Sequence, residues 1–270
     1  MDNSTKEINL HQDGLPEILP AYEDGIFQAV LTLPESAIAL VSAISAFIDR
    51  PVVKVLLRNN DAPAREKDGK REQYDINCSV DDENGDQCNV EMMAHAMEDD
   101  NIDNDHKNLK YRSVFNLSHL HSNQPGKGKE FSKLVKSYQI MLCNYKVFRH
   151  DNSLVERFTY RNEIGIELCE ATTSIFVDLT KAREIAKKPV TEMSDIESWV
   201  VFLALSNNPR YREIILEITK QKEGIFVAFE TLQNISKNAD ERARFHSRRM
   251  WLQDQEHKEA VWRRQVQEKY

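Results

Sequence analysis

Two short arms of alternating side chains, joined by a turn, constrain the fold of this chain more than any other feature. Residues 75–80 and 88–93 each carry polar side chains at odd positions and apolar side chains at even positions, with Met93 as the exception. Alternation with a period of two predicts a half-buried β-strand in each arm. Asn84-Gly85 lies between the arms and is typical of a hairpin turn.

The length of the turn determines which side chains face each other. A two-residue loop would place polar odd positions opposite apolar even positions, so we expect a three-residue loop, 83–85, with its glycine in the left-handed conformation. This register pairs Asn77 with Glu91 and Asp75 with Met93. The hairpin then has one apolar face and one polar face.

Two carboxylates share the polar face of the predicted hairpin. Asp75 and Glu91 become diagonal neighbours, with Cβ atoms about 7–8 Å apart. Both can then reach one hard divalent cation, which prefers oxygen ligands. Two solvated carboxylates on an exposed strand face are the competing interpretation.

The same hairpin carries a family resemblance. An aspartate early in one strand, followed after a tight turn by Glu-x-[Lys/Gln] in the next, resembles the core motif of the PD-(D/E)XK nucleases. The segment YDINCSVDDENGDQCNVEMM, residues 74–93, matches this pattern, and residues 27–50, 106–148 and 235–250 extend the similarity. From about residue 24 to about residue 249, the chain resembles the Rpn family of recombination-promoting nucleases, which are PD-(D/E)XK transposases.

The resemblance implies a metal site and a DNA substrate. Asp75, Glu91 and the backbone carbonyl of Met92 would hold Mg²⁺ or Mn²⁺ for phosphodiester hydrolysis. Arg112, at the expected start of the following helix, would contact a phosphate. The residue two positions after the glutamate is Lys or Gln in these proteins but Met93 here, and a thioether cannot orient a water or stabilise a phosphate oxygen as they do.

Two functions are therefore open for this chain. The first is a metal-dependent DNA endonuclease with catalytic residues Asp75, Glu91 and Met93, weakened by the methionine. The alternative is a catalytically inactive DNA- or protein-binding descendant of the same family. DNA is the expected partner in the first case.

Further candidate residues flank the hairpin. In PD-(D/E)XK folds the helix before the sheet often adds an acid to the metal site; Asp24 and Glu35 are candidates here, although either also suits a helix start. The loop at residues 124–129 carries Lys127 and Lys129, which we expect to contact DNA phosphates. It lacks the GxxxxGK[ST] spacing of a nucleotide-binding loop.

The remaining patterns predict an α/β fold, in which a mixed sheet is flanked by helices, with a helical C-terminal region. Further strands are expected at 52–58, 137–147, 156–161 and 174–179, and helices at 24–33, 34–48, 110–123, 195–205, 209–220, 223–235 and 238–268. In the helix at 110–123, a stripe of Tyr111, Val114, Phe115 and Ser118 is expected to pack on the sheet. We divide the chain into a polar arm (1–23), a nuclease-like domain (24–188) and a helical extension (189–270).

Composition narrows the function classes. The net charge of −8 argues against a non-specific nucleic-acid coat but permits a nuclease with local basic elements. No apolar run approaches the roughly 20 residues of a membrane span, and the N-terminus lacks a signal pattern, so we expect a cytoplasmic protein without membrane contact. The four cysteines lack CxxC spacing and are expected to be reduced core residues. DNA preference, homo-oligomerisation and biological role are left open.

Overall fold

The computed structural model describes residues 17–58, 75–81, 85–94, 102–124, 130–148 and 152–247, together with residues 250, 258 and 261. Most of the predicted polar arm lies outside this part of the chain. Its last residues do not behave as an arm, because Leu19 and Ala21 are buried and the Leu19 N–H donates to Ser236 Oγ at 3.0 Å. The three predicted segment boundaries stay a prediction.

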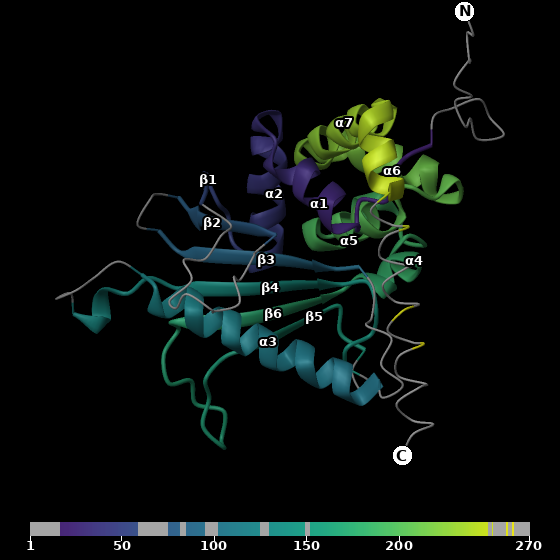
Figure 1. The fold of residues 1–270 in the computed structure, drawn as a ribbon. Helices are drawn as coiled ribbons and strands as arrows, with labels where there is room; N and C mark the ends of the chain where they lie inside the picture. Colours follow the sequence, from purple (N-terminus) through teal and green to yellow (C-terminus); the bar gives the residue numbers. More distant parts are fainter. Residues whose placement is uncertain are drawn as a thin grey trace, which may run out of the picture.

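Within the described residues, six strands form one mixed sheet in the order β1-β2-β3-β4-β6-β5 (Figure 1). The strands are β1 (Val55–Leu57), β2 (Ile76–Val80), β3 (Gln87–Met93), β4 (Ser137–Cys143), β5 (Val155–Phe158) and β6 (Thr172–Asp178). The central strands β3, β4 and β6 are parallel, and the outer strands pair antiparallel. The α/β fold predicted from the sequence is confirmed, and β4 is buried along its whole length, as its apolar run predicts.

The predicted hairpin exists, but its register was wrong by two residues. Asn77 pairs with Asn89, not with Glu91, and the Val80 N–H donates to the carbonyl of Asp86, so the loop spans 81–85. Arg50 stabilises this longer loop from outside the hairpin, because its guanidinium binds the carboxylates of both Asp81 and Asp86. A shift of two residues keeps odd positions opposite odd positions, so the predicted faces are unchanged.

The two faces of the sheet are covered by different elements (Figure 1). One face and the adjoining helical layer form the main hydrophobic core, which includes Ile76, Val90, Met92, Ile140 and Leu142. The other face is covered by the long helix α3. The helices are α1 (Asp24–Thr32), α2 (Ala37–Ile48), α3 (Ile102–Ser122), α4 (Ala182–Ile185), α5 (Asp195–Leu205), α6 (Arg212–Gln221) and α7 (Glu223–Lys237), with 3₁₀ turns at 34–36, 131–133, 179–181, 190–192 and 209–211.

Helix α3 contacts the sheet through a different stripe from the one predicted. Tyr111, Val114 and Phe115 are 66, 55 and 59 % exposed, so the expected aromatic stripe faces away from the sheet. The buried stripe mixes leucines with polar residues at helical spacing: Leu109, Ser113, Asn116, Leu117 and Leu120. The buried polar side chains of α3 need hydrogen-bond partners. The sheet face below α3 therefore also holds buried polar groups.

The C-terminal helices form a layer with α1 and α2. The predicted helix at 195–205 is confirmed residue for residue, and α6 and α7 end within two residues of their predicted ends. Helix α7 packs closely on α2, because a Cβ added at Gly224 would lie 2.2 Å from Ser42 Cβ. Small residues on both helices thus allow the close approach of α2 and α7. Residues 239–247 are helical, and most of the last predicted helix lies outside the described residues.

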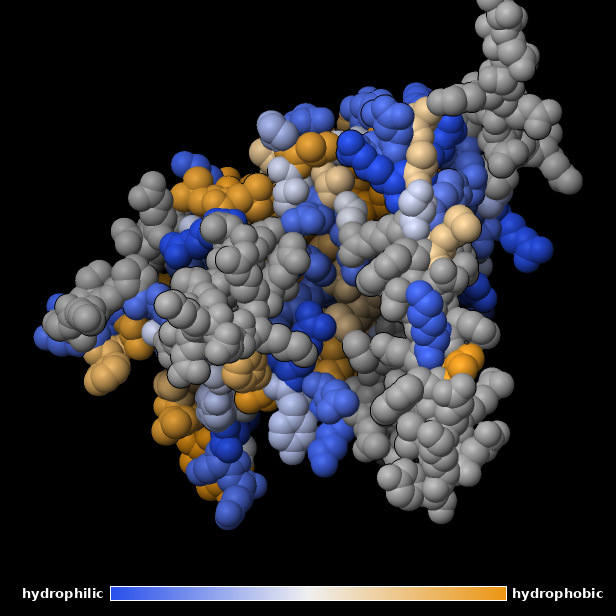
Figure 2. Space-filling model, in the orientation of Figure 1, coloured by the Kyte–Doolittle hydropathy of each residue, from blue (hydrophilic) through white to orange (hydrophobic). Residues whose placement is uncertain are grey.

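Two further sequence expectations concern cysteines and apolar segments. Cys78, Cys88 and Cys143 are free and buried, as expected, whereas Cys169 is exposed. In the described part of the chain, no single helix has the length and hydropathy of a membrane span; the bent pair Asp24–Thr32 and Pro34–Ile48 reaches both only in combination, with a 74° bend. Ile164, Ile166 and Leu168 are largely exposed in the segment between β5 and β6, and Figure 2 shows hydrophobic side chains where this segment projects below the sheet.

Candidate metal and phosphate site

Asp75 lies where β2 begins, beside the edge of β3. Its Oδ2 accepts a hydrogen bond of 2.8 Å from the backbone N–H of Met92. Continuing the observed register by one pair places Asp75 directly opposite Glu91, at a typical Cβ separation of about 4.5–5.5 Å. The predicted meeting of these two carboxylates is thus closer than the diagonal arrangement expected from the sequence.

The backbone of Met92 is turned toward the same place. In an extended strand, the N–H and C=O of one residue point to the same edge. Because the Met92 N–H is directed at Asp75, its carbonyl also points to the edge that β2 leaves open. The Met92 carbonyl is therefore oriented so that it could bind a metal ion together with the two carboxylates.

Glu91 is held by a network of amide donors below α3. Its carboxylate is 1 % exposed, and Oε1 accepts hydrogen bonds from Asn116 Nδ2 at 2.6 Å, Asn89 Nδ2 at 3.0 Å and Gln139 Nε2 at 3.4 Å. Asn89 Nδ2 also donates to Gln139 Oε1 at 2.7 Å. These contacts, from β3, β4 and α3, fix the position of one Glu91 oxygen and leave the other for a different role.

Arg112 lies at that second oxygen. Its Nη2 is 2.8 Å from Glu91 Oε2, a distance typical of an ion pair. The direction is not that of a hydrogen bond, because Oε2 is buried and accepts none from the described residues. The Arg112 side chain is 48 % exposed while that of Glu91 is 1 % exposed. The guanidinium therefore reaches from solvent to a buried carboxylate.

The electrostatics of the site favour a positive charge. Burial raises the pKa of the Asp75 carboxyl to about 7; the Met92 N–H lowers this pKa, the charges of Asp24 and Glu91 raise it further, and Arg112 lowers it. Asp24, in the first turn of α1, is thus close enough to Asp75 to act on it. Of the two acids that the sequence suggested for the helix before the sheet, Asp24 approaches the site and Glu35 is exposed in the 3₁₀ turn at 34–36.

The donor set suits a hard divalent cation. Asp75, the Oε2 atom of Glu91 and the Met92 carbonyl offer oxygen ligands only, and Mg²⁺ is commonly held by one or two carboxylates with water and substrate phosphate completing its shell. No group of three or more His, Cys, Asp or Glu side chains in the described ranges has the arrangement of a metal site. A cation at this position would have two carboxylate ligands and would compete with Arg112 for Glu91 Oε2.

Comparison with known proteins identifies the family. A family model described as PD-(D/E)XK nuclease family transposase matches residues 21–260. The chain belongs to this family. No curated protein and no solved structure matches it. The family resemblance that the hairpin carries is thereby confirmed.

Met93, where the family resemblance leads us to expect a lysine or glutamine, lies on the same sheet face as Glu91. Its side chain is partly buried and packs against an apolar cluster below α3 that includes Leu109, Cys143 and Phe176. The predicted site face is therefore not the half-exposed surface expected from the sequence, because α3 covers it. Met93 adds packing there and no hydrogen-bond donor.

The two predicted DNA contacts Lys127 and Lys129 lie outside the described residues. The loop that carries them leaves α3 near Gln124, which binds the backbone of Val135 and the Ser137 hydroxyl at the start of β4. The start of β4 is opposite to the strand end where Met92 and Asp75 meet, since Ser137 pairs with Gln87 and Leu142 with Met92. The DNA contact of these lysines stays a prediction.

Sequence reasoning missed the residues that hold Glu91. Asn116, Asn89 and Gln139 donate to its carboxylate, and Ser113 Oγ lies 3.1 Å from Ser174 Oγ in the same layer. The signal in the sequence was the spacing of polar Ser113 and Asn116 among leucines, which is the spacing of one helix face. The aromatic stripe around Phe115 drew the prediction to the other face of the helix.

Proposed function

We propose that this chain is a metal-dependent DNA endonuclease, in which Asp75, Glu91 and the Met92 carbonyl hold Mg²⁺ or Mn²⁺. The observation that carries the proposal is the approach of Asp75 to the open edge of β3, where its carboxylate accepts the Met92 N–H beside Glu91. A divalent cation bound in such a site polarises the scissile phosphate and activates water for hydrolysis. The family assignment supports DNA as the substrate.

Each residue of the site has a distinct role in this proposal. The amides of Asn116 and Asn89 orient the Glu91 carboxylate through Oε1, which leaves Oε2 as the ligand atom. Arg112 is paired with Oε2, and on release its half-exposed guanidinium contacts a phosphate of the bound strand. Asp24 adds negative charge near Asp75 and strengthens cation binding.

Met93 supports a second candidate, a non-catalytic DNA- or protein-binding descendant. A lysine or glutamine at this position would contribute a donor toward the phosphate, and the loss of one such donor lowers the rate by on the order of 10²–10³-fold. We therefore expect slow nicking from the endonuclease and none from the descendant.

Calorimetric titration with Mn²⁺ and Mg²⁺, alongside a plasmid-nicking assay, separates the two functions. The endonuclease binds metal and nicks the plasmid at a rate that scales with protein concentration. Asp75→Asn, which keeps the shape of the side chain, abolishes both. Metal binding without nicking, even at high protein concentration, supports the descendant, and nicking that persists in Asp75→Asn contradicts the proposed site.

A further inference from the structure

A second group of charged residues lies at the same end of the sheet as the carboxylate site, beyond the carboxyl ends of the central strands. Lys146, Lys181, Arg183 and Lys187 line a recess of about 320 Å³ together with Asp178, Thr180 and Glu184. Four cationic side chains face two acidic ones, an excess of two positive charges in a chain whose net charge is −8. A basic recess in an acidic protein indicates attraction for an anion.

The sheet places this recess near the metal site. Across the parallel strands, Met93 pairs with Cys143 and Cys143 with Asp178, so Asp178 lies two strands, or about 10 Å, from Met93. Asn144, just after β4, donates its N–H to the Met93 carbonyl at 2.9 Å and its Nδ2 to the Ala94 carbonyl at 3.3 Å. Lys146 follows two residues later and lines the recess together with Asp178 of β6.

The acidic residues of the recess do not neutralise its lysines. Asp178 accepts hydrogen bonds from the Thr180 N–H at 2.9 Å and the Thr180 hydroxyl at 2.5 Å, which fix its carboxylate within its own turn. Among the described residues, no carboxylate lies within ion-pair distance of Lys146, Arg183 or Lys187, and all three are exposed. Their charges are therefore available to a ligand.

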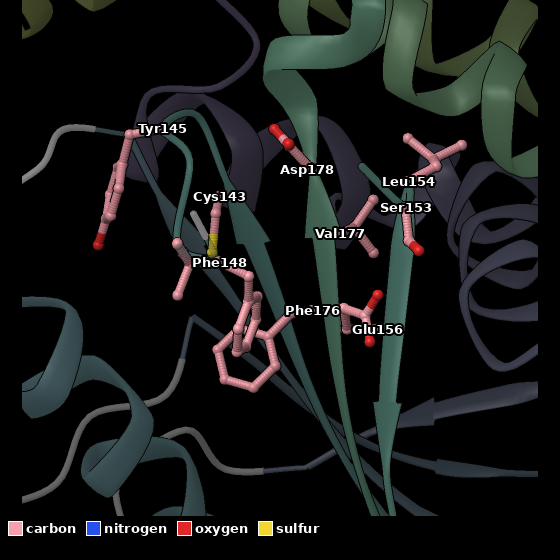
Figure 3. A pocket seen from close by; sticks show the side chains of 10 residues that line it. Cys143, Tyr145, Phe148, Ser153, Leu154, Glu156, Phe176, Val177 and Asp178 are labelled. Atoms are coloured by element: carbon pink, nitrogen blue, oxygen red, sulfur yellow. The ribbon is translucent and has the colours of Figure 1, made fainter. Parts of the chain in front are cut away.

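Lys181 and Asp178 connect the recess to the segment before β5. Lys181 Nζ donates to Asn152 Oδ1, and the Asp178 N–H donates to the Leu154 carbonyl at 2.9 Å. Asp178 also lines a small, mostly apolar pocket with Phe148 and Phe176, and Figure 3 shows its carboxylate directed away from the two rings. The two phenylalanine rings thus pack beside β6, and the Asp178 carboxylate faces the recess instead of the rings.

We infer that this recess binds the phosphate backbone of a nucleic acid that extends from the carboxylate site across the carboxyl ends of β3, β4 and β6. Lysine side chains recognise phosphate as a point charge, without base specificity. The inference rests on the proposed function for its substrate and adds a binding surface to it. It places the principal phosphate contacts of this strand on Lys146, Arg183 and Lys187.

The test compares two triple variants with the same reduction in positive charge. The first is Lys146→Gln with Arg183→Gln and Lys187→Gln; Lys181 is left intact because it binds Asn152. The control is Arg210→Gln with Lys220→Gln and Lys237→Gln, three exposed residues of the C-terminal helical layer. Binding of a fluorescein-labelled 30-base-pair duplex is measured by anisotropy in EDTA from about 50 to 300 mM salt, so the measurement does not depend on cleavage.

The recess variant is expected to bind about tenfold more weakly at 100 mM salt, and the slope of log affinity against log salt is expected to fall by roughly 2–3, near 0.9 for each phosphate that the variant no longer neutralises. The control variant should match the wild type in slope. Equal behaviour of the two triple variants, absence of duplex binding by the wild type, or competition by polyglutamate as strong as by DNA would overturn the inference. Because nicking is assayed separately, a protein that binds through the recess but never nicks refutes the proposed function alone.

Discussion

The two faces of the central sheet are both buried, yet they are built from different chemistry. The face that joins the main core presents Ile76, Val90, Met92, Ile140 and Leu142, all at most 3 % exposed. The face below α3 presents Asn89, Glu91 and Gln139, which are buried to the same degree. The hydrophobic face stabilises the fold through the apolar surface area that it buries. On the polar face, each buried group needs a hydrogen-bond partner.

The difference between the two faces indicates which face stabilises the fold and which face is suited to a function. A buried carboxylate surrounded by amides is a poor way to stabilise a sheet, since apolar residues of similar volume are often as good or better. Residues that break the local rule of an apolar core commonly mark a functional site. In the proposed function, the polar face carries the chemistry and the opposite face stabilises the fold.

Glu91→Gln gives the largest expected effect. The amide keeps the shape of the side chain, and its oxygen still accepts hydrogen bonds from Asn116 and Asn89, so we expect a change of less than about 1.5 kcal/mol in the free energy of unfolding. Loss of the ligand charge should lower metal-dependent nicking by on the order of 10³-fold, or about 4 kcal/mol of barrier. Denaturant unfolding and plasmid nicking measure the two quantities.

Leu142→Ala on the opposite face is the matched control. Leu142 is fully buried, so its truncation should destabilise the protein by about 2–5 kcal/mol and leave the nicking rate per folded molecule unchanged. A Glu91→Gln protein that unfolds as readily as Leu142→Ala would make Glu91 a structural residue and remove the contrast between the faces.

The pH dependence of stability tests the charge on the polar face. The folded pKa of Asp75 is about 7, against an ordinary value of 3.8, so the folded chain binds more protons between these pH values. Asp75 thus contributes stability that is complete below about pH 4 and is lost as the pH rises to 7. Without metal, we expect wild type to lose about 2 kcal/mol relative to Asp75→Asn between pH 5 and pH 8, after allowance for partial solvent screening.

Urea unfolding of both proteins at the two pH values, in EDTA, gives this difference directly. A constant difference between wild type and Asp75→Asn across the range would mean that the Asp75 carboxyl titrates near its ordinary value. The Asp75 carboxyl would then lack the burial, and the neighbouring charges of Asp24 and Glu91, that raise its pKa.

The contrast between the faces was partly visible in the sequence. Alternation in the hairpin arms predicted which side chains share a face, because a register shift of two residues keeps odd with odd. The longer loop is bound by Arg50, which contacts Asp81 and Asp86 across more than thirty residues, and no local pattern in the hairpin predicts such a contact.

The burial of the polar face was hidden for a related reason. Tyr111, Val114 and Phe115 form the stripe of α3 that the sequence pattern placed on the sheet, yet they are exposed. The helix turns Asn116 inward to donate to the Glu91 carboxylate and Ser113 inward to bind the Ser174 hydroxyl on β6. A helix face chosen by a buried partner on another element cannot be read from the helix alone.

Met93 gives the smallest expected effect and is the most direct test of how the polar face works. It follows Glu91 on the same face, where Lys or Gln in the family would supply a donor toward the phosphate. Met93→Gln and Met93→Lys should raise the metal-dependent nicking rate at least about tenfold, equivalent to about 1.4 kcal/mol, since the three side chains are similar in length. Glutamine should do so with little loss of stability, because Met93 is only partly buried against its apolar cluster.

Neither substitution should restore nicking in an Asp75→Asn background, because that site lacks a metal ligand. If both variants bind Mn²⁺ as the wild type does and nick no faster, position 93 does not reach the phosphate, and the polar face would hold metal without the donor that the family places there.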